Sequence, residues 1–337
     1  MPGTEWTRRI WAIVALGMLG LPFVAGDGYY LNTLNFIALY AMPAIGLCLL
    51  VGYCGQLSIS HAAFFAIGAY TSGVLSVKFA VPPWLSVLVA QGVAGLIAGF
   101  IGWVVLRLSG HYLAIATLSF TVIVEVAIKE MPKWTGGLTG LTAIPPLTLG
   151  TLRLSSDYAF YFLAWSVALA MLLLALNLGE SRIGRAFRAV REGEKVTELL
   201  GIDVSALKIQ AFVLSSLFAS IGGSLYAHFV GFVSPTVGSV GFAIDIILVL
   251  AFGGFDRLWG AMIGVAAVTY LNEYAVAFAD YKRVVFGLVL IAIMMFLPAG
   301  LLPGGAAIFK RLVARFGLCS SSRTSRNPSA GWRRSAT

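Results

Sequence analysis

The chain has 337 residues, of which 59% are hydrophobic and only 11% are charged. Its mean hydropathy is +0.91, and soluble domains of ordinary composition carry about 25% charged residues. This composition excludes a water-soluble globular protein. The formal net charge of +9 is concentrated in a few loops and in the tail, as in the cytoplasmic loops of membrane proteins, and does not indicate a nucleic-acid partner.

Ten apolar segments are bounded by charged residues, glycine or proline. A helix needs about 20 mostly apolar residues to cross the hydrocarbon layer, so we expect an all-α integral membrane protein of about ten transmembrane helices. The eighth segment is short and the third follows a glycine-rich turn, which leaves a re-entrant or broken segment open for each. The segments are Ile10 to Ala25, Leu31 to Val51, His61 to Phe79, Trp84 to Leu106, Tyr112 to Ile128, Tyr158 to Leu178, Ile209 to Val230, Val240 to Phe252, Trp259 to Ala279 and Val284 to Leu302.

The distribution of basic residues predicts the orientation of the chain. Most of the 23 lysines and arginines lie before the first segment, in the 180–208 loop, or in the tail from Lys310. Since basic loops stay in the cytoplasm, both termini and the 180–208 loop are predicted to be cytoplasmic. Arg8 and Arg9 before an apolar stretch also resemble a secretory signal, but nine more spans follow, which favours a retained anchor helix.

The predicted organisation is an N-terminal anchor helix at 1–30, a transmembrane domain at 31–304, and a tail at 305–337. The tail is basic and serine-rich with little apolar content, so we expect it to be disordered in the cytoplasm.

The 180–208 loop is too long and too charged for a simple turn. Within it, Val196, Leu199 and Leu200 have the i, i+3, i+4 spacing of one helix face, and Gly201 stands where a helix end takes a left-handed residue. We therefore expect a short amphipathic helix beside the membrane. From spacing alone, contact with anionic lipid headgroups and docking into a groove of a soluble partner are equally favoured.

Residues 51–75 place polar side chains at the junction of two predicted spans. Gln56, Ser58, Ser60 and His61 follow a pair of glycines there. At membrane depth such residues need a cavity or partners within the protein, which makes them candidates for a solute path. The simpler alternative is a polar cytoplasmic turn with a serine N-cap.

Three acidic residues lie within the predicted spans, near their outer ends. Glu125, Asp245 and Glu273 belong to spans five, eight and nine, where an ionised side chain is costly without a partner. If they point inward together, they form a path that receives the ammonium group of an amino acid. The alternative is that Glu125 pairs with Lys129 at i, i+4, while the other two reach the interface or bond between helices.

The sequence contains no motif for ATP binding or enzymatic chemistry. It has no GxxxxGK[ST], HExxH or GxSxG run, and Cys48, Cys54 and Cys319 have no metal-ligand spacing. We expect a transport subunit that is not an enzyme and binds no cofactor itself. The 135–146 segment, TGGLTGLTAIPP, is predicted to bend sharply and to present backbone amides.

Six ordered blocks of sequence resemble the permease subunits of branched-chain amino acid ABC importers, in particular the longer LivM type. The resemblance covers residues 30–304 approximately. It rests on VGYCGQLSISHAAFFAIGAYT, TGGLTGLTAIP, GRAFRAVREGEKVTELLGIDVSALKIQAFVLSS, GSLYAHFVGFVSP, AFGGFDRLWGAMIG and FLPAGLLPGG. The chain departs from the family pattern at Asp256-Arg257, where relatives tend to have small residues, and at Ala261, where proline is common.

The resemblance implies a five-plus-five inverted repeat in the inner membrane of a bacterium or archaeon. It also implies four kinds of partner: a second permease subunit, two cytoplasmic ATPases that use ATP and Mg, an extracytoplasmic binding protein, and the lipid bilayer. Urea or short amides are alternative solutes, and an ion-coupled secondary transporter is a less favoured alternative mechanism. Asp245 matches a position that is acidic in the family. By the same resemblance, the residues that contact an ATPase are Arg188, Arg191, Glu192, Glu194, Glu198, Leu199, Leu200 and Gly201.

Overall fold

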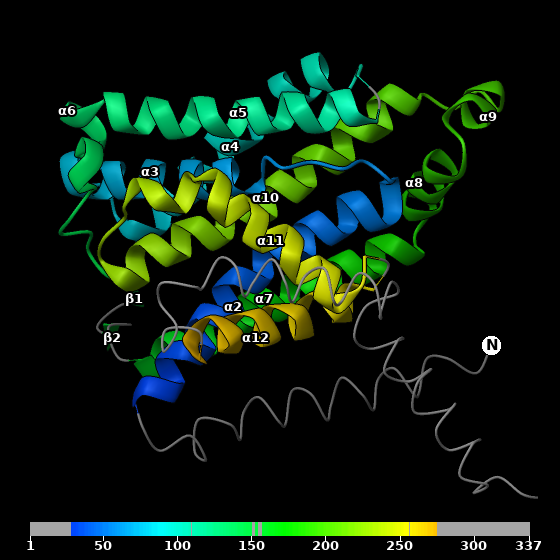
Figure 1. The fold of residues 1–337 in the computed structure, drawn as a ribbon. Coiled ribbons are helices and arrows are strands. Elements are labelled where there is room, and N and C mark those ends of the chain that lie inside the picture. The colour runs from blue at the N-terminus through cyan, green and yellow to red at the C-terminus, as the bar shows by residue number, and fades with distance from the viewer. Residues whose placement is uncertain (1–27, 109, 150–151, 154–156, 256, 275–337) are drawn as a thin grey trace, which may run out of the picture.

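The protein is described by a computed structural model that covers residues 28–108, 110–149, 152–153, 157–255 and 257–274. These residues form a bundle of long helices that lie side by side (Figure 1). The long helices are α2 (Gly28–Cys48), α3 (His61–Lys78), α4 (Pro83–Val105), α5 (His111–Glu130), α7 (Asp157–Glu180), α10 (Val204–Val230), α11 (Val240–Gly253) and α12 (Leu258–Tyr274).

Short elements occupy the two ends of the bundle. At one end lie α8 (Arg182–Glu192) and α9 (Glu194–Leu199); at the other lie α6 (Pro132–Thr135) and a ladder of two short strands, β1 (Thr148–Leu149) and β2 (Leu152–Arg153) (Figure 1). The 3-10 turns η2 (Gly137–Thr139) and η3 (Pro235–Gly238) complete the described chain. Residues predicted to face opposite sides of the membrane are thus at opposite ends of the bundle.

The structure confirms a multi-pass helical protein but not the count of ten spans. Five helical segments among the described residues are long and apolar enough to cross a membrane: 28–53, 83–105, 111–130, 157–180 and 204–230. The third predicted span forms a helix at the expected place, α3, which is not among these five. Predicted spans one and ten, and the tail, lie outside the described residues.

The eighth and ninth predicted spans form the two arms of one bent element. α11 and α12 meet at 118° and, if they count together, supply a sixth candidate span in the described part of the chain. Gly254 has a φ of +93° at the bend, and Gly253 and Gly260 approach so closely that a Cβ on either would overlap the other's backbone. The eighth segment itself is an unbroken helix, and the bend follows it, between Gly253 and Leu258.

Close backbone contacts hold the centre of the bundle together. α10 packs against α2, α3 and α4, and a Cβ added to Gly223 of α10 would overlap the carbonyl oxygen of Phe65 on α3. On α3 itself, a Cβ at Gly68 would overlap the backbone of Ser220. Glycines therefore let α3 and α10 approach more closely than larger side chains would permit, which is common between membrane helices.

Candidate functional site

The predicted amphipathic helix in the 180–208 loop is present as α9, ended by Gly201 with a φ of +78°. Its apolar side chains point away from the bundle: Val196 is 65% exposed, Leu199 88% and Leu200 72%. Glu192 and Glu198 are exposed beside them. Large aliphatic side chains left this open, among charges, are typical of a surface that another molecule covers.

The loop contains a second helix, α8, that the sequence analysis did not separate from α9. Ser181 caps α8 by accepting a hydrogen bond from the Gly184 amide at 3.2 Å. Phe187 and Val190 of α8 are buried against the bundle, whereas the apolar side chains of α9 are exposed. α8 therefore anchors the loop, and α9 presents its outer surface.

Three polar contacts join α8 and α9 to neighbouring elements, two of them to the end of α2 and one to α10. α2 continues into a π-helical turn, Leu49–Tyr53, a distortion that is frequent at functional sites. The Arg191 guanidinium donates to the Gly52 carbonyl oxygen in this turn. Gln56, just beyond it, donates to the Glu194 carboxylate at 3.1 Å, and the same carboxylate pairs with the buried Lys208 ammonium at 2.6 Å.

Arg188 and Gly55 complete this junction. Arg188 donates to the Gly179 carbonyl oxygen at 2.9 Å, and its guanidinium lies 6.0 Å from the centre of the Tyr53 ring. Gly55 has a φ of +70°, and a Cβ there would lie 2.9 Å from Cγ of Arg191. A larger residue at position 55 would thus be strained in its backbone and would displace Arg191. Side chains of α8 and α9 are therefore in direct contact with the residues at the end of α2.

The polar side chains of residues 56–61 are buried, although Leu57 between them is exposed. Gln56, Ser58, Ser60 and His61 are all buried, and the hydroxyls of Ser58 and Ser60 are 2.9 Å apart. Ser60 occupies the N-cap position of α3, as the alternative of a serine-capped turn expected, but its side chain makes no capping bond. Neither ring nitrogen of His61 has a hydrogen-bond partner among the described residues.

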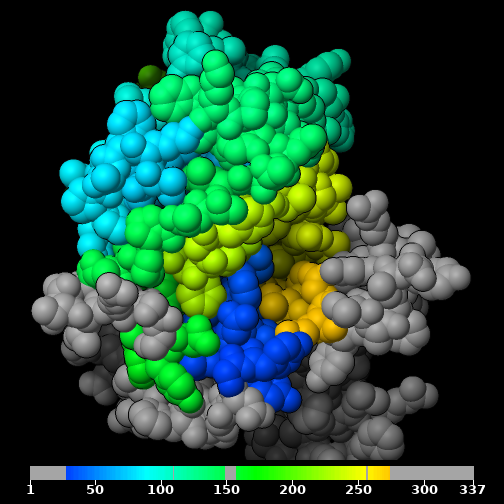
Figure 2. All heavy atoms as spheres, turned by 90° about the vertical axis from the view of Figure 1, so that its left-hand side faces the viewer, coloured from blue at the N-terminus to red at the C-terminus, as the bar shows by residue number. Residues whose placement is uncertain are grey.

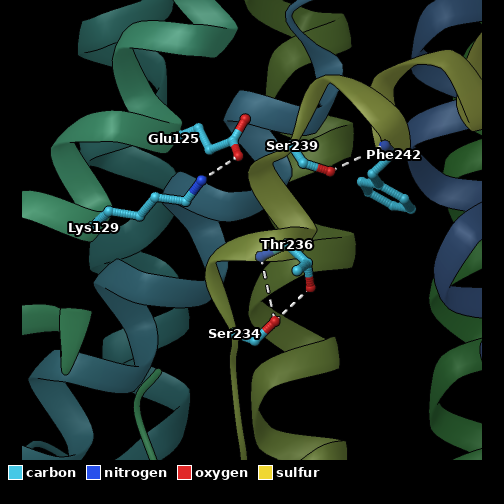
Figure 3. Close-up of polar contacts among 6 residues, drawn as sticks. All are labelled: Glu125, Lys129, Ser234, Thr236, Ser239 and Phe242. Carbon is cyan, nitrogen blue, oxygen red and sulfur yellow. Dashed lines mark hydrogen bonds and ion pairs between the residues drawn. The ribbon is translucent and has the colours of Figure 1, made fainter. Parts of the chain in front are cut away.

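The three acidic candidates have different surroundings. The Glu125 carboxylate forms an ion pair with the Lys129 ammonium on the same helix, at 2.6 Å between Oε1 and Nζ (Figure 3). The alternative interpretation expected this pair. Glu273 of α12 accepts a hydrogen bond from the Thr33 hydroxyl of α2 at 3.0 Å. Asp245 is partly buried on α11, and α2, α11 and α12 pack on one another.

A hydroxyl-rich segment that includes η3 packs against α5, the helix that carries Glu125 (Figure 3). The Ser234 hydroxyl bonds to the Thr236 hydroxyl and accepts from the Thr236 amide at 3.3 Å. Ser239 caps α11 by accepting from the Phe242 amide at 3.3 Å. These bonds fix the turn between α10 and α11. The sequence pattern did not single out Ser234, Thr236 or Ser239.

Sequence reasoning also missed a buried polar network between α3, α4 and α10. Nε2 of His228 lies 2.7 Å from the Ser72 hydroxyl, and its Nδ1 lies 2.7 Å from the Pro145 carbonyl oxygen. Ser86 of α4 bonds to both Ser72 and Ser76 of α3, at 3.2 and 2.8 Å. Buried polar groups need such partners. The only signal in the sequence was the spacing of serines within apolar helices.

The described residues contain no group of three histidine, cysteine, aspartate or glutamate side chains placed to hold a metal ion. The Cys48 and Cys54 thiols are buried and form no disulfide with a described residue. The candidate functional residues therefore fall into three groups. They are polar side chains that join helices, the exposed apolar side chains of α9 at one end, and partly buried carboxylates within the bundle.

Comparison with known proteins gives one consistent family. Residues 29–294 match the family model described as "Branched-chain amino acid transport system / permease component". The chain is 31% identical over 320 residues to the high-affinity branched-chain amino acid transport system permease protein LivM of Escherichia coli K12, covering 86% of this chain and 74% of LivM. It is 27% identical to the high-affinity branched-chain amino acid transport system permease protein LivH of the same organism, covering 80% of this chain and 93% of LivH.

A less similar relative is named for a different import system. The chain is 24% identical to the autoinducer 2 import system permease protein LsrC of Yersinia enterocolitica, covering 87% of this chain and 82% of LsrC. No solved structure matches the chain. The family model spans most of the sequence, and the described part of the molecule is a bundle of apolar helices. The chain belongs to the branched-chain amino acid ABC transporter permeases, a family of multi-pass membrane proteins.

Proposed function

We propose that this chain is one permease subunit of an ATP-driven importer for branched-chain or similar hydrophobic amino acids. An extracytoplasmic binding protein delivers the amino acid, a second permease subunit pairs with this chain, and two cytoplasmic ATPases supply the energy from ATP and Mg. The chain lies in the inner membrane of a bacterium or archaeon. The likeness to both LivM and LivH, two permease proteins from one organism, supports the pairing of two related subunits.

The observation that carries this proposal is the exposed apolar surface of α9, joined by polar contacts to the end of α2. Leu199 and Leu200 are open to a partner, and Arg191 and Glu194 link the loop to Gly52 and Gln56. An ATPase that binds α9 can therefore move the end of a core helix. A loop held only to lipid headgroups would not need the exposed leucines to lie among both acidic and basic residues.

The proposed solute path includes the partly buried acids Asp245 and Glu273. An ammonium group is attracted to such carboxylates, and passage requires binding that is weak enough for release. Glu125 already pairs with Lys129, so its place on the path is secondary. Gln56, Ser58, Ser60 and His61 provide the alternative lining if the acids are structural.

Uptake into proteoliposomes tests the function directly. The chain is reconstituted with its second permease, ATPases and binding protein, and labelled leucine is supplied outside. We expect uptake that requires ATP and the binding protein, is inhibited by excess isoleucine and valine, and is unaffected by urea. Uptake driven by an ion gradient without ATP would establish the secondary transporter, and inhibition by urea alone would establish the amide solute.

A further inference from the structure

A hollow of about 440 Å³ opens at the end of the bundle opposite α8 and α9. It lies between the first turns of α2, the start of α7 and the end of α10, and its lining includes Tyr29, Asn32, Phe36, Asp157 and Phe229. Figure 2 looks onto this end and shows the start of α2, in blue, reaching the surface beside α12, in orange. Small-molecule sites have volumes of about 300–1,000 Å³, so the hollow has the capacity for an amino acid.

The hollow combines one carboxylate with an apolar wall. Asp157 is exposed at the start of α7, and no described residue bonds to its carboxylate, although its main-chain oxygen accepts from Asn35 at 3.2 Å. The rings of Phe36 and Phe229 are 5.8 Å apart, edge to face. Phe229 also stacks on Phe160 at 4.2 Å, so this wall is held firmly in place.

We propose that this hollow is the outer receiving site for the amino acid, an inference that rests on the proposed function. The Asp157 carboxylate pairs with the ammonium group of the zwitterion, and the Asn32 amide donates to its carboxylate. The aliphatic side chain then contacts Phe36 and Phe229. Because Asp157 remains open to water, the ion pair is weak, which suits a solute that must move on.

The same features explain a preference for aliphatic amino acids. Aromatic rings bury an aliphatic chain favourably because the free energy follows the apolar area removed from water. A urea molecule would place a polar amide against this wall and offer no ammonium to Asp157. The site therefore distinguishes hydrophobic amino acids from short amides both by the Asp157 carboxylate and by the apolar wall.

The alternative role of Asp157 is purely structural, because an acid in the first turn of a helix favours the helix dipole. The test must therefore separate transport from assembly. It uses Asp157→Asn, Asp157→Glu and, as a control, Glu130→Gln. Glu130 is exposed at the end of α5 and outside the hollow. Each variant is assembled into the full importer, and leucine uptake is measured with saturating loaded binding protein and normalised to the amount of complex.

We expect Asp157→Asn to lower uptake by about threefold to tenfold, with Asp157→Glu restoring most of it and Glu130→Gln unchanged. Phe229→Leu should lower leucine uptake more than alanine uptake. Stimulation of the ATPases by the binding protein should be unaffected. Wild-type uptake by Asp157→Asn, or an equal loss in Asp157→Asn and Glu130→Gln, would overturn this site. Failure of the wild-type importer to carry amino acids would instead overturn the proposed function.

Discussion

The Lys208 ammonium is almost fully buried, and it pairs with the Glu194 carboxylate in the 180–208 loop at 2.6 Å. A buried charge that loses its partner destabilises a protein by about 3–5 kcal/mol when both groups are buried. The Glu194 side chain is 38% exposed, so water reduces the effect. The ion pair is therefore buried at its Lys208 end and open to water at its Glu194 end.

Replacement of Glu194 by glutamine should lower the free energy of unfolding by about 1–2 kcal/mol, because Lys208 is left buried without an opposite charge. Adding Lys208→Met should restore most of the loss. The measurement is thermal unfolding of the purified protein in detergent, with Glu198→Gln as the exposed control. Equal melting temperatures for Glu194→Gln and Glu198→Gln would show that the pair contributes nothing.

A second prediction about single residues concerns Asp245 and Glu273. Asp245→Asn and Glu273→Gln should each slow amino acid uptake without lowering the amount of assembled complex, since each removes a charge that attracts the ammonium group. Uptake and complex recovery are measured on the same preparations. If both variants transport at the wild-type rate, these acids are structural, and the path follows Gln56, Ser58, Ser60 and His61.

Among the elements, the contact between α3 and α10 depends most on small residues. Gly223→Ala should destabilise the protein by about 1–3 kcal/mol, because its Cβ would overlap the Phe65 carbonyl and force the helices apart. Gly92→Ala on α4 is the matched control, since nothing lies within 4 Å of the added Cβ. Thermal unfolding compares the two variants, and an equal response would contradict the close packing of these helices.

Apolar length predicted the positions of the helices but not their packing. α9 and its end at Gly201 followed from i, i+3, i+4 spacing, which is a local pattern. The bonds from Arg191 to Gly52 and from Gln56 to Glu194 join residues more than 130 positions apart, and no local pattern contains them. The third segment was left open as re-entrant or broken, whereas α3 is a continuous helix with most of its side chains buried against its neighbours.

Of the candidate functional regions, the sequence predicted the one at the end of the bundle with α9 but not the one at the opposite end. Leucines spaced along one helix face, among charges in a long loop, indicate a surface helix from the sequence alone. The hollow beside Asp157 could not be found in this way, because Tyr29, Asp157 and Phe229 meet only when α2, α7 and α10 pack together. Asp157 in the sequence is simply an acid at the start of an apolar segment.

Across the whole molecule, the two ends of the bundle should lie on opposite sides of the membrane. Leu200→Cys at the end with α9 should react with an impermeant maleimide only after the cells are opened. Leu138→Cys, 77% exposed at the other end, should react in intact cells. Cys48 and Cys54 are buried, and Cys319 is replaced beforehand. Labelling of both positions from the same side would contradict the orientation.

In the proposed mechanism, α9 couples the ATPase to the helices of the permease. The most direct measurement is ATPase copurification and ATP-dependent leucine uptake for the double variant Leu199→Asp/Leu200→Asp. Buried aliphatic side chains contribute about 1.5–3 kcal/mol each, so copurification should fall by more than about tenfold and uptake should be lost. Membrane insertion should be normal, and Leu138→Asp at the opposite end should retain full ATPase binding. Normal uptake by the double variant would show that α9 does not couple the ATPase to the permease.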